Sequence, residues 1–570
     1  MDGIWRDRAI RVMYRLGLAR AVRETVAIVS PRGWREHARN RADIKRLEPA
    51  VRQTSEQILE RTKSAKGIVL LISMDGLSNV MLQLPVIAGI ASAGFEPVVL
   101  LPSKGSKEQR FLYSRIGVRR FAFWDEGGEC QDRLAVMQQL DSCKTQDDLL
   151  NLRWKQISVG KFAVSTLMRR LRAGSIDPSK AKVMRHLQVV VRRTLDHAHA
   201  ALALLDHWQP VSVIFIDRGY TPEGPMFDAC IQRGLRPATM NSAHRDNALI
   251  LKRYGPDNAN VHPVSLSDET WRRLLAMPWN EAQWERVHHE IEHCYRSGQW
   301  YGEVATQFNT RILDHQALQA KLKLDPAKRT VLLFPHIFWD ATFFWGVDVF
   351  GDYEEWFRES VRIAWRTSSV NWIIKIHPAN VVKNIRDGTN AEFSEEVVLR
   401  EFGPIPPHIC IIRADTDIST LSLFSIGHVC LTVRGTVGIE AAAFGLSVVT
   451  AGTGRYDRLG FTRDIETRED YFAVLETIAD LPAPTPQQTE LARRYAFGAF
   501  MVRPLDTEAI RFSYSRSRSA SLEVGISETA CTDLFGCRDV DAIARWLQSG
   551  AEDTPNDLNL PESSEEQVGH

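Results

Sequence analysis

The sequence lacks any apolar run long enough to cross a bilayer. Its most apolar stretches, Ile68–Ser73 and Met81–Ala93, are interrupted or fall short of the roughly 18 residues that a membrane-spanning helix needs. Closely paired cysteines are also lacking: eight are scattered over 570 residues, and no signal peptide precedes them. These absences predict a cytoplasmic protein that does not cross a membrane.

An excess of charge of one sign is lacking too. The 71 Arg and Lys residues balance 70 Asp and Glu residues, so nothing in the overall charge indicates a nucleic-acid partner. Residues 1–48 are locally basic, with twelve Arg and Lys against six Asp and Glu. Their apolar residues recur at helical spacing, and such a helix either packs on the protein body, the commoner outcome, or makes peripheral contact with the cytoplasmic face of the inner membrane or an assembly complex.

The length exceeds what one hydrophobic core usually supports, and two stretches of alternating strands and helices account for it. In the first, a buried-strand pattern over 67–73 is followed by a helical stretch and a second strand over 97–101. The second alternation begins at Thr330. The predicted organisation is a helical arm (1–60), a first Rossmann-like domain (61–255), a helical connector (256–327), a second Rossmann-like domain (328–480), C-terminal helices (481–550) and a disordered acidic tail (551–570).

The expected fold class is therefore α/β, with two Rossmann-like domains facing a cleft and helical additions at both ends. Strands that alternate with helices form parallel sheets, and such sheets bind ligands at the carboxyl ends of their strands. Residues that directly follow a predicted strand are therefore the first candidates for a site.

The segment Lys375-Ile376-His377-Pro378 ends one of these strands, because proline cannot continue it. His377 is thereby brought to the carboxyl edge of the sheet. A histidine beside a lysine can donate hydrogen bonds to phosphate and offset the charge that develops on a nucleotide leaving group. The plainer alternative is a strand-end histidine satisfied by the backbone.

A second candidate segment runs from Val433 to Gly445, from a strand through a glycine-containing turn into a helix. Free N–H groups at a helix start bind anions, and glycines allow close approach. We therefore expect an anion-binding loop near the helix start, where Glu440 can reach a sugar or ribose hydroxyl or simply be a first-turn acid that the helix dipole favours. The loop residues are Arg434, Gly435, Thr436 and Gly438.

Together, the segments KIHP and TVRGTVGIEAAAFGLSVVTAGTGRYDRLGFT resemble the bacterial capsule-polysaccharide glycosyltransferases, including the Kdo-transferring and polysialyl-transferring types. The likeness is concentrated in residues 330–465. It implies a GT-B enzyme in which 61–255 is the acceptor domain and 328–480 is the nucleotide-sugar domain. His377 would contact the phosphate of a CMP-linked sugar, and Arg434, Gly435 and Thr436 would face the donor. It does not choose the sugar.

Candidates for the remaining chemistry follow other strands. Met74-Asp75-Gly76 resembles the acidic-acidic-Gly motif of bacterial sialyltransferases, with Met in place of one acid, so Asp75 is the expected catalytic base; a turn-forming Asp-Gly pair is the alternative. His336 and Asp340 follow the first strand of the second domain and are expected to contribute to the donor site. The aromatic residues beside them either stack on the ligand or plug the space between the domains.

One motif suggests a metal. His289-Glu290-Ile291-Glu292-His293 spells the zinc-protease pattern, but the segment is a polar connector, and Glu292 stands where such helices are normally apolar. The Asp-x-Asp pairs at 415–417 and 539–541 are interpreted as surface acids. No metal is expected.

The sequence thus predicts a glycosyltransferase that moves a sugar from a CMP- or UDP-linked donor to a surface or capsular polysaccharide or a glycolipid. It needs no cofactor beyond the nucleotide-sugar. Two alternatives stay open: a sugar-nucleotide epimerase of the same fold, and a non-catalytic scaffold of a polysaccharide assembly complex.

Overall fold

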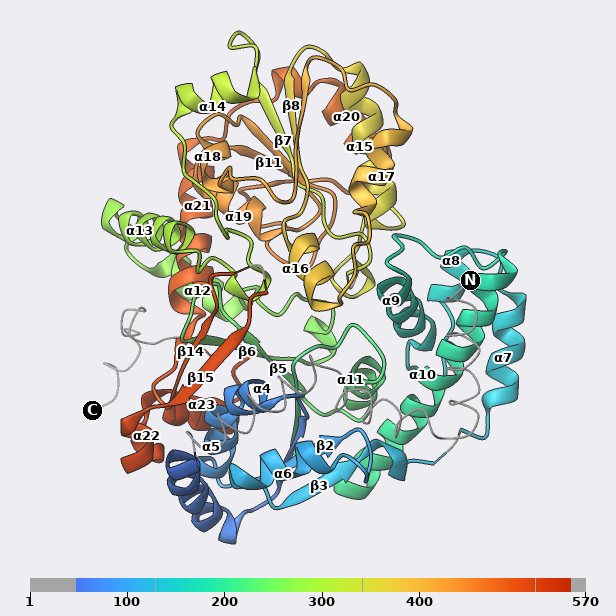
Figure 1. Cartoon of the computed structure of the whole chain (residues 1–570), viewed down its shortest axis with the longest axis vertical. Coiled ribbons are helices and arrows are strands. Elements are labelled where there is room, and N and C mark those ends of the chain that lie inside the picture. The colour runs from blue at the N-terminus through green and yellow to red at the C-terminus, as the bar shows by residue number, and fades with distance from the viewer. Residues whose placement is uncertain (1–47, 129, 341, 518, 555–570) are drawn as a thin grey trace.

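The computed structural model describes residues 48–554 apart from 129, 341 and 518. Two sheets dominate it, one in each half of the molecule (Figure 1). The first has seven strands in the order β13 (Leu505–Asp506), β6 (Ala248–Arg253), β5 (Ala238–Ser242), β4 (Ser212–Phe215), β1 (Ile68–Ile72), β2 (Glu96–Leu101) and β3 (Arg120–Phe123). The second has six, in the order β12 (Arg463–Asp464), β11 (Ser447–Thr450), β10 (Val429–Thr432), β7 (Thr330–Leu333), β8 (Asn371–Lys375) and β9 (Ile409–Ile412).

The apolar strand runs form these sheets because both faces are covered. In β1, Ile68, Leu70 and Ile72 pack into one hydrophobic cluster, whereas Val69 and Leu71 pack into another on the opposite face. This is the two-residue alternation of a strand buried on both sides. All neighbours in the second sheet pair in parallel, and so do β5, β4, β1, β2 and β3 in the first. The expected α/β fold with two Rossmann-like domains is confirmed.

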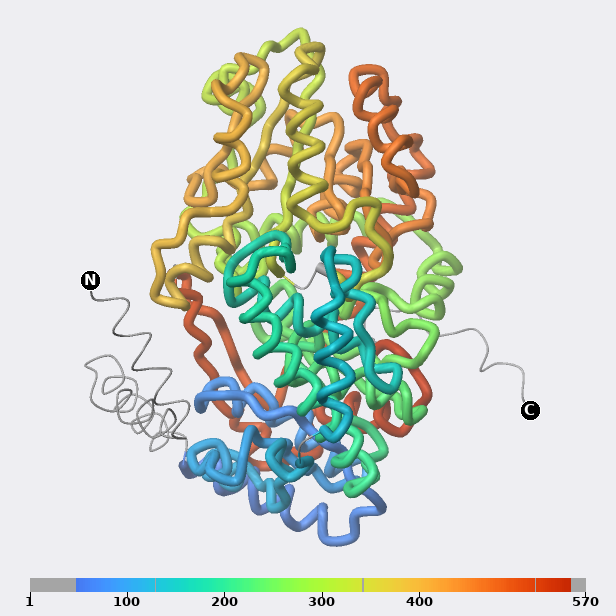
Figure 2. The backbone as a smooth tube through the Cα atoms, turned by 90° about the vertical axis from the view of Figure 1, so that its right-hand side faces the viewer, coloured from blue at the N-terminus to red at the C-terminus, as the bar shows by residue number. Residues whose placement is uncertain are grey.

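Helices cover these sheets. Those of the first half are α4 (Leu77–Leu82), α5 (Leu84–Ser92), α6 (Lys107–Arg115), α7 (Arg133–Ser142), α8 (Gln146–Leu150), α9 (Val159–Leu171), α10 (Ala181–Trp208) and α11 (Glu223–Gln232). Those of the second half are α15 (Tyr353–Arg366), α16 (Ala379–Arg386), α17 (Ser394–Glu401), α18 (Thr420–Phe424), α19 (Thr436–Ala443) and α20 (Arg468–Glu476). Helices α7–α10 gather at one side of the first sheet, toward the viewer in Figure 2.

The connector contains α12 (Asp268–Ala276), α13 (Glu281–Ser297) and α14 (His315–Leu322). Its apolar residues Trp284, Ile291 and Tyr295 share a hydrophobic cluster with Leu332 of β7 and Ile373 of β8. The connector therefore packs on one face of the second sheet. This packing brings the chain that follows α13 to the carboxyl ends of the strands.

The expectation of helices alone over 481–550 is wrong. Besides α21 (Pro486–Phe497), α22 (Glu528–Thr532) and α23 (Arg538–Gln548), this segment contains β13 and a hairpin of β14 (Ile510–Tyr514) and β15 (Leu522–Ile526). Strand β13 pairs antiparallel with β6, and α23 packs on α5, so the chain returns to the first domain. Gly89 permits this packing, because a Cβ atom there would lie 2.5 Å from Cγ2 of Ile543.

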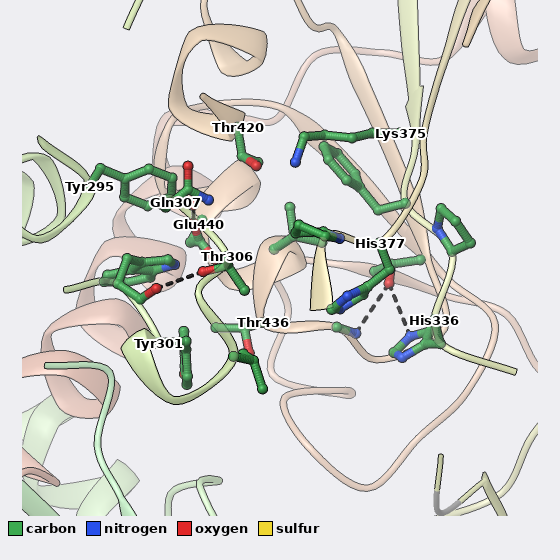
Figure 3. A pocket seen from close by; sticks show the side chains of 18 residues that line it. Tyr295, Tyr301, Thr306, Gln307, His336, Lys375, His377, Thr420, Thr436 and Glu440 are labelled. Atoms are coloured by element: carbon green, nitrogen blue, oxygen red, sulfur yellow. Dashed lines mark hydrogen bonds between the residues drawn. The ribbon is translucent and has the colours of Figure 1, made fainter. Parts of the chain in front are cut away.

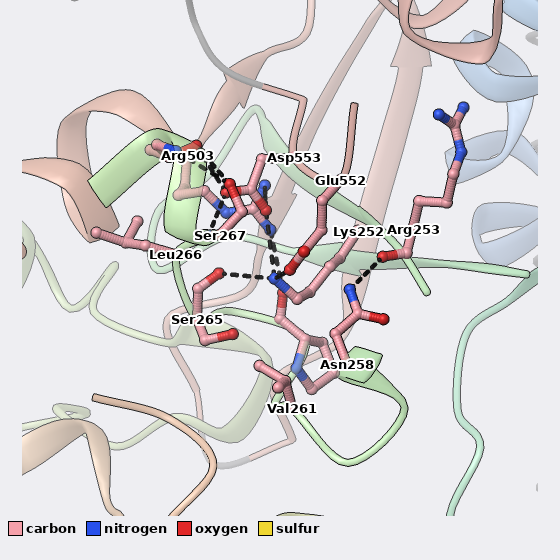
Figure 4. Close-up of polar contacts among 12 residues, drawn as sticks. Lys252, Arg253, Asn258, Val261, Ser265, Leu266, Ser267, Arg503, Glu552 and Asp553 are labelled. Carbon is pink, nitrogen blue, oxygen red and sulfur yellow. Dashed lines mark hydrogen bonds and ion pairs between the residues drawn. The ribbon is translucent and has the colours of Figure 1, made fainter. Parts of the chain in front are cut away.

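The acidic tail expected from 551 onward is not disordered over residues 551–554; residues 555–570 lie outside the described part of the chain. Asp553 is buried, with its Oδ1 2.9 Å from a guanidinium nitrogen of Arg503 and 3.4 Å from Nζ of Lys252 (Figure 4). Its Oδ2 accepts hydrogen bonds from the Ser267 backbone N–H (2.7 Å) and the Thr270 hydroxyl (2.8 Å). Two buried cations require this carboxylate, which is why the end of the segment is held inside.

Most of the predicted N-terminal arm, residues 1–47, lies outside the described residues, and a helix over 48–61 represents the rest. The predicted membrane contact of the basic segment falls on those residues. Within the described part of the chain, no helix combines the length and apolar character that crossing a membrane requires.

Candidate functional site

A cavity of about 230 Å³ lies where β7, β8 and β10 end and the connector crosses them. In Figure 3, Lys375 and His377 point into it from one side, and Tyr295, Tyr301 and Gln307 come from the other. Its polar lining comprises Tyr295, Tyr301, Thr306, Gln307, His336, Lys375, His377, Thr420, Thr432, Thr436 and Glu440. The structure thus brings together six residues that the sequence proposed from three separate segments: Lys375, His377, His336, Gly435, Thr436 and Glu440.

Lys375 is the last residue of β8 and is only 4% exposed. No hydrogen bond or ion pair joins its amine to any described residue. Burial lowers the pKa of Lys375 to about 8, against the opposing effect of Glu440. A buried amine that lines a cavity without a partner is suited to bind an anionic group of a ligand.

His377 lies two residues beyond Lys375, where Pro378 begins the turn into α16. Its Nδ1 accepts a hydrogen bond from the backbone N–H of Ala379 at 3.2 Å, which leaves the proton of a neutral ring on Nε2. Burial, and then the charges of Lys383 and Lys375, lower the pKa of His377 to about 4. At neutral pH His377 is therefore an uncharged donor rather than a cation.

The loop before α19 contributes Gly435 and Thr436 to the cavity lining, but the side chain of Arg434 turns away. Its guanidinium is buried, donates to the Thr453 carbonyl at 2.8 Å and forms an ion pair with Asp348. Arg434 therefore stabilises the loop from the side that faces away from the cavity. Gly438 also lies behind it, because a Cβ atom there would lie 2.1 Å from the hydroxyl of Tyr456.

A cation that the sequence reasoning missed lies beside this loop. Arg455 donates to the Thr436 hydroxyl at 2.6 Å and to the Arg434 carbonyl at 3.3 Å. It follows β11, so its place after a strand of the parallel sheet was the available signal. Arg455 holds Thr436 in place at the start of α19.

Glu440 is buried in the first turns of α19 and accepts a hydrogen bond from the Tyr295 hydroxyl. Burial raises the pKa of Glu440 to about 7, although Tyr295 and the positive charge of Lys375 favour its ionised form. The carboxyl group lines the cavity and can accept or donate a hydrogen bond near neutral pH.

His336 and Asp340 separate after β7. His336 lines the cavity, with its ring stacked on Tyr353 at 4.4 Å between centroids, and burial together with Arg434 lowers its pKa well below the usual value. Asp340 lies outside the cavity, where it accepts hydrogen bonds from the Tyr220 hydroxyl (2.9 Å) and the Lys383 amine (2.6 Å). Although burial opposes ionisation, Lys383 lowers the pKa of Asp340 to about 2. Asp340 thus joins the two domains rather than lining the cavity.

Asp75 is not brought to the cavity. It follows β1 at the carboxyl edge of the first sheet, is exposed and accepts a hydrogen bond from Gln109 of the same domain. An acidic residue of the first domain that does approach the second is Asp217, which follows β4. Its Oδ2 lies 3.7 Å from a guanidinium nitrogen of Arg169; burial raises the pKa of Asp217, and the charge of Asp340 adds to this effect. Arg169 also stacks over the ring of Tyr220. We call Arg169, Asp217, Tyr220, Asp340 and Lys383 the interdomain cluster.

The zinc-protease pattern is not assembled. His289 and His293 lie on an exposed face of α13, whereas Glu290 turns inward to His244 (3.0 Å) and Arg245 (3.1 Å). Among the described residues, His244, Glu290 and Cys294 are spaced closely enough to hold a metal ion. Oε1 of Glu290 contacts Nε2 of His244 and also accepts a hydrogen bond from the guanidinium of Arg245. These residues therefore form an ion-pair network.

No family model and no curated protein matches the chain. Solved structures of similar layout include the beta Kdo 2,4 transferase of Thermosulfurimonas dismutans KpsC (15% identity, 57% of this chain and 87% of that chain, TM-score 0.32). They also include a UDP-GlcNAc 2-epimerase from Neisseria meningitidis bound to UDP-GlcNAc, with 10% identity over 76% of this chain and 97% of that chain and a TM-score of 0.25. A third is the calicheamicin glycosyltransferase CalG4, with 13% identity over 76% of this chain and 94% of that chain and a TM-score of 0.26. Likeness this slight carries no argument about function, and the fold rests on the strand pairing itself.

Proposed function

We propose that this chain is a glycosyltransferase that moves a sugar from a CMP- or UDP-linked donor to a polysaccharide or glycolipid acceptor. The observation that carries the proposal is the unpartnered amine of Lys375 in a cavity at the carboxyl edge of the second sheet. It lies beside the neutral donor His377 and the start of α19. Such a set of donors fits a phosphate group.

The donor phosphate would lie against Lys375, His377 and the first turn of α19, which stabilise the charge that develops when the bond from the sugar to phosphate breaks. These groups can act directly, so the proposal needs no cofactor beyond the donor. Glu440 and the hydroxyls of Tyr301 and Thr420 are available to the hydroxyls of the nucleoside.

The cavity volume of about 230 Å³ is below the roughly 300–1,000 Å³ of pockets that enclose a whole ligand. It suits part of a nucleotide-sugar, and the sugar would extend toward the interdomain cluster. The acceptor would then approach from the first domain, and closure of the domains would exclude water from the donor.

Calorimetric titration with CMP, UDP and a panel of their sugar conjugates tests the binding step, and nucleotide release with and without polysaccharide or lipid extracts tests turnover. Binding of one nucleotide class and acceptor-stimulated release are expected. If no nucleotide binds, the enzymatic proposal is wrong and a scaffold role gains support. If an isomerised sugar nucleotide accumulates without any acceptor, the chain is an epimerase instead.

A further inference from the structure

Glu303 lies at the junction of the two domains and beside the donor cavity. It belongs to the short 3₁₀ helix η4 (Gly302–Val304) of the connector, and the residues on either side of this position, Tyr301 and Val304, line the cavity. Helix η4 packs against α16 of the second domain and against β14, which returns to the first domain. In Figure 1, α16 lies on the side of the upper domain that faces the lower one.

The carboxylate of Glu303 is accessible to solvent and has no hydrogen-bond or ion-pair partner among the described residues. Two other acids at this junction are already paired: Asp340 accepts from Lys383 and Tyr220, and Asp217 pairs with Arg169 and accepts from the backbone N–H of Gly219. An acid that already accepts from two donors is a weaker proton acceptor than one with no partner.

Charged groups from both domains surround Glu303. From the second domain these are Lys383 and Arg386 of α16 and Asp340 after β7; from the first domain they are Asp217 after β4. The returning hairpin adds Tyr514, whose hydroxyl bonds to Ser242 at the end of β5, and Arg516, 3.1 Å from the Cβ position of Gly302.

These surroundings favour proton uptake by Glu303. Partial burial raises the pKa of Glu303 above its usual value, with Asp217 and Asp340 adding to the effect and Lys383 and Arg386 opposing it. A carboxylate whose pKa is raised holds a proton more firmly, which makes it a better general base.

We propose that Glu303 is the base that deprotonates the attacking hydroxyl of a sugar acceptor bound over the interdomain cluster; this rests on the proposed glycosyl transfer. In a single displacement, the acceptor oxygen bonds to the anomeric carbon while its proton passes to the Glu303 carboxylate. The bond from the anomeric carbon to the phosphate oxygen breaks, and its electron pair stays on the nucleotide beside Lys375 and His377. Glu303 then releases the proton to solvent.

The arrangement also assigns a class of acceptor. The interdomain cluster presents a guanidinium, a phenol and carboxylates within one small area, with Arg169 and Asp217 both partly exposed. Alternating donors and acceptors of this kind match vicinal hydroxyls of a sugar. The acceptor end that enters the site is therefore a hydroxyl-bearing sugar unit.

The test is nucleotide release from CMP-Kdo, CMP-sialic acid, UDP-GlcNAc and UDP-glucose, in which water can stand in for the acceptor and needs the same base. Glu303→Gln is expected to lower kcat at least about 100-fold with unchanged affinity for CMP or UDP, since general-base catalysis contributes roughly 10²–10⁴-fold. Glu303→Asp is expected to recover part of the rate. The acid limb of the pH profile should disappear from the residual activity of Glu303→Gln, which a purely structural role would not cause.

Glu285→Gln, at an exposed glutamate of α13 in the same connector, is the matched control and should keep full activity. If the wild-type protein binds no nucleotide and releases none from any donor, the proposed function itself fails. If it turns over a donor but Glu303→Gln keeps more than about a third of that rate, Glu303 is not the base. Loss of activity in Asp75→Asn together with normal activity in Glu303→Gln would assign the role to Asp75.

Discussion

Nucleotide binding is expected to draw protons onto Lys375 at mildly alkaline pH. Its pKa of about 8 leaves the amine about half deprotonated at pH 8 and about nine-tenths deprotonated at pH 9 in the free protein. A phosphate placed beside it stabilises the ammonium, and an opposite charge at such a distance shifts a pKa by roughly 1–3 units. If the pKa of Lys375 rises by about 2 units in the complex, each bound nucleotide is accompanied by the uptake of about 0.5 proton at pH 8, about 0.8 proton at pH 9 and only about 0.1 proton at pH 7.

Calorimetric titration of UDP or CMP in two buffers of different ionisation enthalpy measures this uptake directly. Glu440, with a pKa of about 7, contributes mainly near pH 7, and Glu440→Gln separates the two groups. Lys375→Met keeps most of the side-chain volume but is expected to abolish the uptake at pH 9 and to weaken binding by about 2 kcal/mol, roughly 30-fold. Proton uptake that is absent at pH 8–9, or that persists in Lys375→Met, would refute the placement of phosphate beside this amine.

Two further substitutions test the site and the fold. His377→Ala is expected to raise the Kd for the bound nucleotide about tenfold, by the loss of one hydrogen bond of about 1–1.5 kcal/mol, and because the ring is neutral well above its pKa of about 4, the effect should be equal at about pH 7.5 and about pH 8.5. A melting temperature that falls strongly instead would show that His377 is structural. Asp553→Asn leaves Arg503 buried without a counter-charge and leaves Lys252 with Glu552 as its remaining acidic partner; it is expected to destabilise the fold by about 3–5 kcal/mol in urea unfolding. The folded-state pKa of Asp553 is depressed to about 2, so its contribution is present above pH 4 and lost as the pH falls toward 2; a variant that unfolds with the wild-type acid dependence would contradict this.

The strands that hold the donor cavity were predictable because their signals are local. A short apolar run followed by Pro378 is enough to end β8 and to place His377 at the sheet edge. The same reasoning placed Thr436 and Glu440 at the start of α19. When a residue lies directly after a strand, the sequence is sufficient to predict that it lies at the carboxyl edge of the sheet.

The direction of a long side chain is not a local property. Arg434 was expected to face the donor, but Asp348 and Tyr353, far away in the sequence, draw its guanidinium to the opposite side. Likewise, Tyr295 reads as one more apolar residue of α13, and only the folding of the connector onto β7 and β8 places its hydroxyl on Glu440. Such contacts are decided by tertiary packing.

The return of the chain to the first domain was missed for a similar reason. Strand β13 has only two residues and no pattern of its own, and it forms because β6 offers an unpaired edge. In contrast, β14 does have a strand pattern in the sequence, because its apolar residues Ile510, Phe512 and Tyr514 alternate with polar ones. The structure buries these three residues.

Strand order decides which carboxylate of the first sheet meets the second domain. Asp75 and Asp217 both follow strands of the first sheet, so sequence alone ranks them equally for a place at its carboxyl edge. In the sheet, β4 lies next to β1 on the side of β5 and β6, and Asp217 together with Tyr220 meets the second domain through Asp340. Asp75, one strand farther from β5, contacts Gln109 of its own domain. The proposed transfer brings donor and acceptor together where the two domains meet, and this favours as base a residue of the connector, which belongs to neither sheet and lies between them.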